Sequence, residues 1–332
     1  MVTAVLDVTT LRTLLSAAAA APSIHNTQPW RFRFDPHAPA LEIRAAADRG
    51  LRHIDPAGRA LHLSVGCALL NLRIAAAHSG REPAVRLLPR PDDPGLLARV
   101  RLGGPPHSPE PAGLYDALWR RRSSRLPYTD RRLPTGLPAE LVEAALTEGA
   151  GLVLPDADGT DRLLRLTWEG EQRNRVDADR AEESRRWLRA PYVSALGIPP
   201  TAVGPQDYRE RLPMRDFGAH RRTAALPARS FEVRPRLAVL TTQHDRRADW
   251  LRAGQALERV LLVATAHGLR ASLLHQALEW PDLRTELTSP PEQGRRHVQM
   301  VLRLGYGPEG AATPRRTVWR LPAQGSPPRP QP

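Results

Sequence analysis

Two short stretches of the chain hold side chains that could do chemistry, and the first is a polar loop at residues 22–29. It reads Pro-Ser-Ile-His-Asn-Thr-Gln-Pro, so five of the six residues between the prolines carry a hydroxyl, imidazole or amide group. Pro22 ends the helix expected before the loop, and Pro29 is expected to hold Gln28 in an extended conformation. A loop pinned in this way suits the hydrogen-bonding edge of a flat heterocycle. The alternative is an ordinary helix-to-strand turn beside a buried Trp30, because turns favour the same residue types.

The second stretch is basic and reads Arg-Arg-Arg-Ser-Ser-Arg at residues 120–125. Guanidinium groups bind phosphate oxygens in a bidentate manner, and serine hydroxyls add short donors. The stretch is therefore a candidate phosphate site, with a solvated basic helix end as the alternative. Neither a His-Glu-x-x-His motif nor a Gly-x-Ser-x-Gly motif occurs. We therefore expect no metal and no protein nucleophile, and any chemistry should come from a cofactor.

The arginine content raises the question of nucleic-acid binding. The net charge is +13, the pI is about 11.2 and all 48 basic residues are arginine. We attribute the abundance of alanine, arginine and proline to high-GC coding. Aromatic residues are only 5% of the chain and do not alternate with the arginine clusters. Nucleic-acid binding is therefore disfavoured and is kept as a third hypothesis.

The sequence also bears on the compartment. A single cysteine, Cys67, excludes an internal disulfide framework and a cysteine metal site, and its surroundings predict a small core residue. Residues 61–77 are the longest apolar run, but they include His62, Asn71 and Arg73 and fall short of the ~18–20 residues of a membrane span. No secretory signal is evident. We expect a cytoplasmic protein that does not contact a membrane.

The elements around the two stretches can be predicted from the sequence pattern. An alanine-rich helix at residues 11–20 should precede the polar loop, and an alternating strand at 30–34 should follow it. A helix at 115–119 should precede the basic stretch, and another at 137–145 should follow. The polar loop would then join a helix to a strand, and the basic stretch would lie between two helices.

Two helical segments, at residues 66–80 and 254–268, repeat one pattern. Each begins Gly-x-Ala-Leu and ends at a glycine, and the offset is the same at both ends: 254 − 66 = 188 and 268 − 80 = 188. This indicates one supersecondary unit used twice. Strands are expected at residues 84–88 after the first copy and, later along the chain, at 297–304 after the second.

The second half of the chain is longer than the first. The distance from the alanine-rich helix to the repeated helix is 66 − 18 = 48 positions in the first half and 254 − 145 = 109 in the second, a difference of about 61 residues. We place this insertion at about 170–229, with a helix at 179–188, and expect it to act as a possible lid. The expected domains are a first half at 1–104, a second half at 105–321 after a Gly- and Pro-rich linker at 103–109, and a disordered tail at 322–332.

The polar loop resembles a known family. Pro-Ser-x-x-Asn-x-Gln-Pro-Trp after an alanine-rich helix resembles the flavin-contacting loop of the nitroreductase family of FMN-dependent oxidoreductases. Arg-x-Ser-x-Arg, read from Arg121, is similar to the phosphate-binding motif of that family. With its internal repeat, the chain most resembles the fused, double-length members found in actinobacteria. The resemblance implies an α+β fold of two tandem nitroreductase-like units, each a mainly antiparallel sheet flanked by helices, packed as an intramolecular pseudo-dimer.

The resemblance also implies which residues bind FMN. The arginine motif would hold the phosphate, with Arg125 beside flavin N1 and O2, where a positive charge stabilises the reduced, anionic flavin. Residues 273–275 would face N5, although His275 has the alternative of a surface position at a helix N-terminus. The chemistry would be that of flavin N5, with no catalytic side chain. The expected cofactor-binding residues are Pro22, Ser23, Ile24, Asn26, Gln28, Arg121, Arg122, Ser123, Arg125, Leu273, Leu274, His275, Arg315 and Arg316.

The two halves complement each other. The first has the polar loop but no arginine motif, whereas the second has the motif but reads Glu-Gly-Ala-Gly-Leu at residues 148–152, where the loop should be. One flavin site per chain is therefore expected, in a monomer. The leading hypothesis is an NAD(P)H oxidoreductase, with NADH or NADPH as donor and a small nitroaromatic or quinone as acceptor. The alternative is an FMN-binding or storage protein whose lid covers the flavin.

Overall fold

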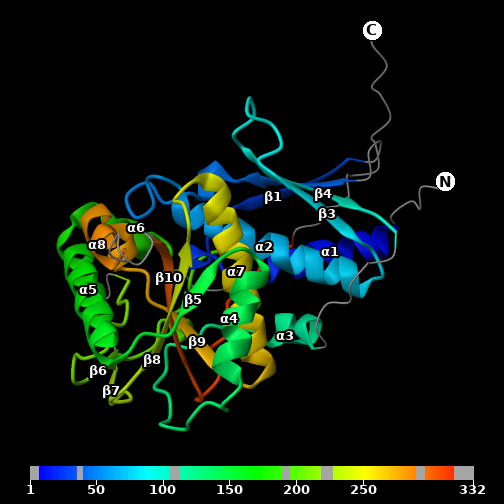
Figure 1. Cartoon of the computed structure of the whole chain (residues 1–332). Helices are drawn as coiled ribbons and strands as arrows, with labels where there is room; N and C mark the ends of the chain where they lie inside the picture. The colour runs from blue at the N-terminus through cyan, green and yellow to red at the C-terminus, as the bar shows by residue number, and fades with distance from the viewer. Residues whose placement is uncertain are drawn as a thin grey trace.

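The computed structural model describes residues 7–35, 40–104, 113–188, 195–217, 227–288 and 296–317. Helices and strands are mixed along the whole chain (Figure 1). In the first half the elements are α1 (Val8–Ala19), β1 (Trp30–Asp35), β2 (Ala40–Ala45), α2 (Arg59–His78), β3 (Pro83–Leu87) and β4 (Leu96–Leu102). In the second they are α3 (Leu114–Arg120), α4 (Leu137–Thr147), β5 (Gly151–Val153), α5 (Ala157–Val176), α6 (Ala178–Arg186), β6 (Gln206–Asp207), β7 (Ala228–Arg229), β8 (Arg236–Thr242), α7 (Arg247–Ala266), β9 (Arg270–Leu273), α8 (Pro281–Leu287) and β10 (His297–Gly305).

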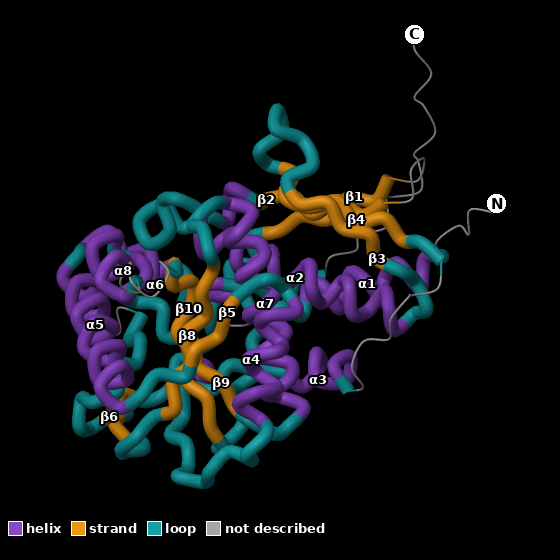
Figure 2. The backbone as a smooth tube through the Cα atoms, in the orientation of Figure 1, coloured by secondary structure: helices purple, strands orange, loops and turns teal. Residues whose placement is uncertain are grey.

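Two antiparallel sheets of four strands carry the fold, and a parallel pair, β6 and β7, accompanies them (Figure 2). The first sheet has the order β1-β2-β4-β3, and the second has the order β5-β8-β10-β9. The two sheets therefore have the same strand order: the first two strands of each sheet along the chain are neighbours, the fourth lies next to the second, and the third lies at the edge. The predicted α+β class with mainly antiparallel sheets and flanking helices is confirmed.

Two long helices, α2 and α7, pack against each other at the centre of the molecule (Figure 1). A Cβ added to Gly254 would lie 2.1 Å from the carbonyl oxygen of Leu63 and 2.8 Å from the Cα of Gly66. The predicted helix starts at Gly66 and Gly254 are therefore wrong: both helices begin seven residues earlier, because the glycines serve close packing inside the helix and not its start. The offset is unchanged, since 247 − 59 = 188 and 266 − 78 = 188.

One hydrophobic core joins the two halves. It contains Leu69 of α2, Ile43 of the first sheet, Leu257 of α7 and Leu302 of the second sheet, all nearly or fully buried. A second cluster packs α5 and α8 on the other face of the second sheet, through residues such as Leu166 and Val301. The segment between β5 and β8 therefore has a core of its own against that sheet.

Several further predictions can be compared with the structure. The helices expected at 11–20, 115–119, 137–145 and 179–188 are confirmed as α1, α3, α4 and α6. The strands expected at 30–34, 84–88 and 297–304 are confirmed as β1, β3 and β10. The strand that directly follows the second repeat is β9, which we did not predict because it is short. Most of the linker, residues 189–194 and 218–226 of the insertion, and the predicted tail at 322–332 lie outside the described residues.

By length and composition alone, α2 could cross a membrane. We expected the apolar run at residues 61–77 to be too short for a membrane span, but the helix that contains it has 20 residues. The helix is nevertheless 78% buried within its most apolar stretch, so its apolar side chains pack inside the protein. It serves as the central helix of the shared core.

Candidate functional site

The polar loop after α1 takes an unusual backbone path. His25, Asn26 and Gln28 all have positive φ angles, of 47°, 52° and 49°. The expectation that Pro29 holds Gln28 in an extended conformation is therefore wrong. Hydrogen bonds impose the left-handed conformation: the backbone N–H of Gln28 donates to Oγ of Ser23 at 3.0 Å, and its side-chain amide donates to the carbonyl of Ala195 at 2.6 Å. A backbone held in this way stores strain, which is common at functional sites.

Two adjoining pockets lie between this loop and the basic stretch, and each has an empty volume of roughly 800 Å³, at 780 and 860 Å³. The first is mostly apolar, with Leu63, Leu257 and Met300 in its wall. The second contains Arg121, Arg122 and Arg315. The pockets share five lining residues, so they form one elongated cavity with an apolar end and a basic end: Pro22, Ser23, His25, Ser123 and Arg125.

The structure brings together all but two of the residues expected to bind the cofactor. Gln28 does not line either pocket, because its amide bonds to Ala195 and its Oε1 accepts the backbone N–H of Arg316 at 2.9 Å. The side chain of Arg316 lies in a separate surface hollow beside α1. The residues that do line the cavity are Pro22, Ser23, Ile24, Asn26, Arg121, Arg122, Ser123, Arg125, Leu273, Leu274, His275 and Arg315.

The basic end is built from helix ends and one buried carboxylate. Nε of Arg121 lies 3.3 Å from Oε1 of Glu258, which is fully buried on α7. Arg315 donates to Oδ1 of Asn26 at 2.9 Å and to the carbonyl of Ala20 at 3.2 Å. Burial and the nearby Arg121 lower the pKa of Arg315 to about 9. The side chain of Arg122 is exposed at the pocket mouth, so this end of the cavity presents three guanidinium groups to a ligand.

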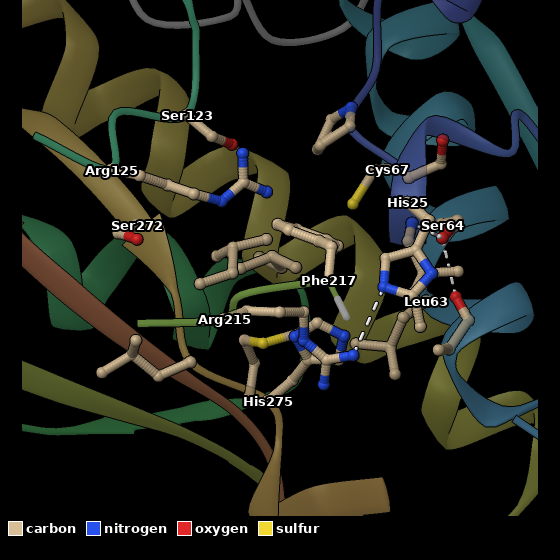
Figure 3. Close-up of a pocket in the computed structure, with 18 of the residues that line it drawn as sticks. His25, Leu63, Ser64, Cys67, Ser123, Arg125, Arg215, Phe217, Ser272 and His275 are labelled. Atoms are coloured by element: carbon tan, nitrogen blue, oxygen red, sulfur yellow. Dashed lines mark hydrogen bonds between the residues drawn. The ribbon is translucent and has the colours of Figure 1, made fainter. Parts of the chain in front are cut away.

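Arg125 lines both pockets, and Figure 3 shows its side chain extending into the apolar one. Its Nη1 donates to the carbonyl of Ala202 at 2.6 Å, and its guanidinium lies 4.9 Å from the ring centroid of Phe217. Burial and the neighbouring Arg215 lower the pKa of Arg125 to about 10. Within the described part of the chain, no carboxylate forms an ion pair with it. A partly buried cation that has no carboxylate partner among the described residues favours an anionic ligand at this point.

The apolar end contains a polar network that the sequence analysis did not predict. Nη1 of Arg215 donates to Nε2 of His25 at 3.3 Å, and its other terminal nitrogen forms an ion pair with Glu279. Figure 3 shows His25 and Cys67 entering the pocket from the side opposite Arg125. Burial, Arg215 and then Arg125 hold the pKa of His25 well below its ordinary value, so the imidazole is neutral. Burial and Glu258 raise the pKa of the Cys67 thiol, which is therefore protonated.

Residues of the insertion cover part of the cavity. Met214, Arg215 and Phe217 line the apolar pocket, and Ile198 and Ala202 line the basic one. No periodicity or motif marks these residues in the sequence. Ser64 and Cys67, by contrast, lie three residues apart on α2, and their shared helix face could have suggested that both face one site.

The insertion is fastened to the first half by backbone groups. The carboxylate of Glu183 on α6 accepts the N–H groups of Arg52, His53 and Ile54 at 2.6, 3.0 and 2.9 Å. The side-chain amide of Asn26 donates to the carbonyl of Gly197 at 2.8 Å. The polar loop therefore holds the insertion as well as lining the cavity.

Together these features define an α+β protein with a cavity suited to a ligand that is apolar at one end and anionic at the other. No group of three or more histidine, cysteine, aspartate or glutamate side chains within the described residues could hold a metal. The elongated cavity is therefore the candidate site for an organic cofactor.

Comparison with known proteins identifies the family. No protein-family model matches the chain. The chain is 34% identical over 321 residues to a Mycobacterium tuberculosis H37Rv protein named "Putative NAD(P)H nitroreductase", covering 94% of this chain and 90% of that protein. A second protein of that strain with the same description is 31% identical over 322 residues, covering 93% of each. A solved nitroreductase with bound FMN from Bacteroides fragilis aligns over 65% of this chain and 98% of its own, at 15% identity and a TM-score of 0.37.

The long matches to the mycobacterial proteins show that the chain belongs to the nitroreductase family. The family predicted from the polar loop and the arginine motif is confirmed.

Proposed function

We propose that the chain is an FMN-dependent NAD(P)H oxidoreductase that binds one FMN in the elongated cavity. The observation that carries this proposal is the join of an apolar pocket to an arginine-lined pocket through Ser123 and Arg125. FMN has the matching shape, with a flat ring system at one end and a phosphate at the other. The relatives' names, which mention NAD(P)H and nitroreductase, support the same assignment.

The residues at the basic end would hold the phosphate. Arg121, Arg122 and Arg315 supply guanidinium donors there, and the Ser123 hydroxyl adds a neutral donor. Arg125 would lie beside N1 and O2 of the ring, where its charge, unpaired among the described residues, stabilises negative charge. When bound, FMN would accept a hydride from NAD(P)H at N5 and pass it to a small acceptor of the nitroaromatic or quinone class.

We further propose that the two halves form an intramolecular pseudo-dimer with one site. The matching strand orders and the 188-residue offset of α2 and α7 support this arrangement. Ten residues, 20–29, join α1 to β1, whereas only three, 148–150, join α4 to β5. Glu148 in the short connection is occupied by ion pairs with Arg73 and Arg259. The second half therefore lacks the loop that a second site would need.

A storage function is the second candidate, and the cover supports it. Met214, Arg215 and Phe217 line the apolar pocket, and Arg125 donates to Ala202 of the same segment. A cover that opens would gate turnover, whereas a cover that stays closed would exclude substrates and slow flavin loss.

Anaerobic addition of NADPH to the flavin-loaded protein separates the two functions. An oxidoreductase should lose its flavin absorbance at a rate on the order of 1 s⁻¹ or faster and regain it when a nitroaromatic is added. A store should keep its oxidised spectrum through the same additions and still be reduced slowly by dithionite. Failure to bind FMN at all would contradict both functions.

A further inference from the structure

His275 and Glu279 form a pair at the apolar pocket to which the proposed function gives no role. His275 lines the pocket, and its side chain is 17% exposed, whereas that of Glu279 is only 4% exposed. Nε2 of His275 lies 3.1 Å from Oε1 of Glu279 but makes no hydrogen bond in this geometry. A buried imidazole nitrogen without a hydrogen bond, facing a carboxylate at this distance, is poised to gain a proton.

The side chain of Glu279 is held in place by groups on the insertion. It forms an ion pair with Arg215, and its Oε2 accepts from Nδ2 of Asn174 at 2.8 Å and lies 3.7 Å from Nη1 of Arg180. Nη2 of Arg215 donates to Oε1, so the oxygen that faces His275 is held in place by this hydrogen bond. Glu279 is therefore an acidic side chain close to His275, and an acidic group at this distance favours the protonated form of an imidazole.

The charges around His275 keep it neutral in the structure. Burial, then Arg215 and His25, hold the pKa of His275 well below its ordinary value. A single added negative charge in the cavity would offset the excess of arginines and favour the imidazolium. The charged and titratable groups that face it are Arg59, Arg125, Arg215, His25 and Glu279.

We propose that His275, paired with Glu279, is the proton carrier of the flavin reaction. This inference rests on the proposed function, in which hydride transfer from NAD(P)H brings two electrons and one proton and leaves one negative charge in the cavity. His275 then takes one proton from solvent at an imidazole nitrogen. On reoxidation it gives this proton to the acceptor. A quinone that receives the hydride and this proton becomes its dihydroxy form, and a nitro group that receives both loses water and becomes a nitroso group.

The other histidine of the cavity lacks the features of a carrier. Nε2 of His25 accepts from Arg215, which can only donate, so the remaining proton is on Nδ1. Nδ1 is buried without a hydrogen-bond partner, and the charged groups that shift the pKa of His25 are both arginines. Protonating His25 would add a third cation without a carboxylate beside it. The carrier is therefore assigned to His275 and not to His25.

The test is the pH dependence of the flavin midpoint potential, measured with redox mediators on the loaded protein. For a two-electron couple, a tenfold change in the equilibrium constant corresponds to about 30 mV. The midpoint potential therefore falls by about 30 mV per pH unit for each proton that is taken up on reduction. Above the pH at which reduced flavin itself loses a proton, the intact protein should show a slope of about 59 mV, and His275→Gln should show about 30 mV. His267→Gln is the matched control, since His267 forms a similar pair with Glu140 at 2.8 Å on the surface.

Each outcome decides the inference without deciding the proposed function. A slope near 30 mV in the intact protein overturns it, even if His275→Gln fails to fold. An unchanged steep slope in His275→Gln also overturns it, because the flavin would then carry the second proton itself. A steep slope that becomes shallow in His25→Gln and not in His275→Gln would move the role to the other histidine. Absence of bound flavin would instead refute the proposed function.

Discussion

The buried pair of Arg121 and Glu258 determines how the basic end of the cavity can be tested. Glu258 is fully buried, and burial raises its pKa while Arg121 opposes that effect. Removing Arg121 would leave this carboxyl group without its cation inside the core. Removing Arg122 leaves no buried carboxyl group without its cation, because the side chain of Arg122 is exposed at the pocket mouth.

Arg121→Ala should therefore weaken FMN binding and also destabilise the flavin-free protein. A buried charge that loses its partner costs about 3–5 kcal/mol, and loss of a charge-assisted hydrogen bond to the phosphate lowers affinity at least about tenfold. Arg122→Ala should lower the affinity without changing the melting temperature of the flavin-free protein. Flavin titration and thermal unfolding measure the two effects. If the exposed Arg132, changed to Ala, weakens FMN binding as much as Arg122→Ala does, the cavity has no specific phosphate site.

The neutral histidines give the fold a pH dependence. The pKa of His25 is depressed in the folded state, so below about pH 6.5 the unfolded chain binds more protons at this residue than the folded one. Stability from this residue is therefore lost as pH falls. Two carboxyl groups act in the opposite direction, because burial raises the pKa of Asp55 to about 6 and that of Glu171 to about 7. The contribution of His25 is therefore measured as the difference in stability between the intact protein and a His25 variant.

We expect the stability of the intact protein to fall relative to His25→Gln as pH is lowered below 6.5. The difference in unfolding free energy should shift by up to about 1.4 kcal/mol per pH unit. Urea unfolding of both flavin-free proteins between pH 5 and 8 measures it. A difference that stays constant over this range would show that the pKa of His25 is the same in the folded and unfolded protein, which would contradict its burial as a neutral imidazole.

For individual residues, the sequence predicted which residue types lie at the cavity but not which groups they contact. Asn26 and Gln28 were assigned to the flavin edge, yet the amide of Gln28 binds Ala195 and Arg316. Hydrogen bonds across more than 160 positions leave no local pattern in a sequence. Arg215 was missed for the same reason, since only the folded insertion brings it beside His25.

Among the elements, the crossing of α2 and α7 is the least tolerant contact. The neighbours that a Cβ on Gly254 would meet are backbone atoms of α2, which cannot move aside without separating the helices. Gly254→Ala should lower the unfolding free energy by at least about 2 kcal/mol, at the upper part of the range for overpacking. Gly104→Ala is the control, because its Cβ would meet nothing within 4 Å. Equal melting temperatures for the two variants would contradict this packing.

The contact of α6 with the first half tests whether the insertion governs access to the cavity. Glu183→Ala should leave three backbone N–H groups unbonded and release the insertion, at a cost of at least about 2 kcal/mol. We expect faster hydrogen exchange in residues 195–217 and faster FMN release. The adjacent Glu182→Ala removes only surface pairs with Arg185 and Arg186 and should change neither rate. Unchanged FMN release in Glu183→Ala would show that the insertion does not retain the cofactor.

Four helices, α1, α3, α4 and α6, were predicted close to their observed positions, whereas α5 and α8 were not predicted. Apolar spacing and alanine runs identified α1, α4 and α6, because these are local properties. The starts of α2 and α7 were placed at internal glycines, since a glycine that permits close helix packing looks the same in sequence as one that begins a helix. The short strand β9 has four residues, too few for a clear alternation.

For the whole molecule, the repeated sheet order supports the proposed pseudo-dimer with one site. The two halves share a core across α2 and α7, so neither is expected to fold alone. The long loop belongs to the first half and the arginine stretch to the second, so both halves are needed for one cavity. This asymmetry accounts for a chain of 332 residues that would bind a single cofactor.

The most direct test of the account is the flavin content of the purified chain. The protein should be saturated with FMN, freed of excess ligand and precipitated with acid, and the released flavin compared with the protein concentration. We predict a ratio near one FMN per chain for the intact protein, and a ratio far below one for the Arg122→Ala, Ser123→Ala double variant. A ratio near two would mean that the second half has its own site, and a ratio near zero for the intact protein would mean that the cavity does not hold FMN.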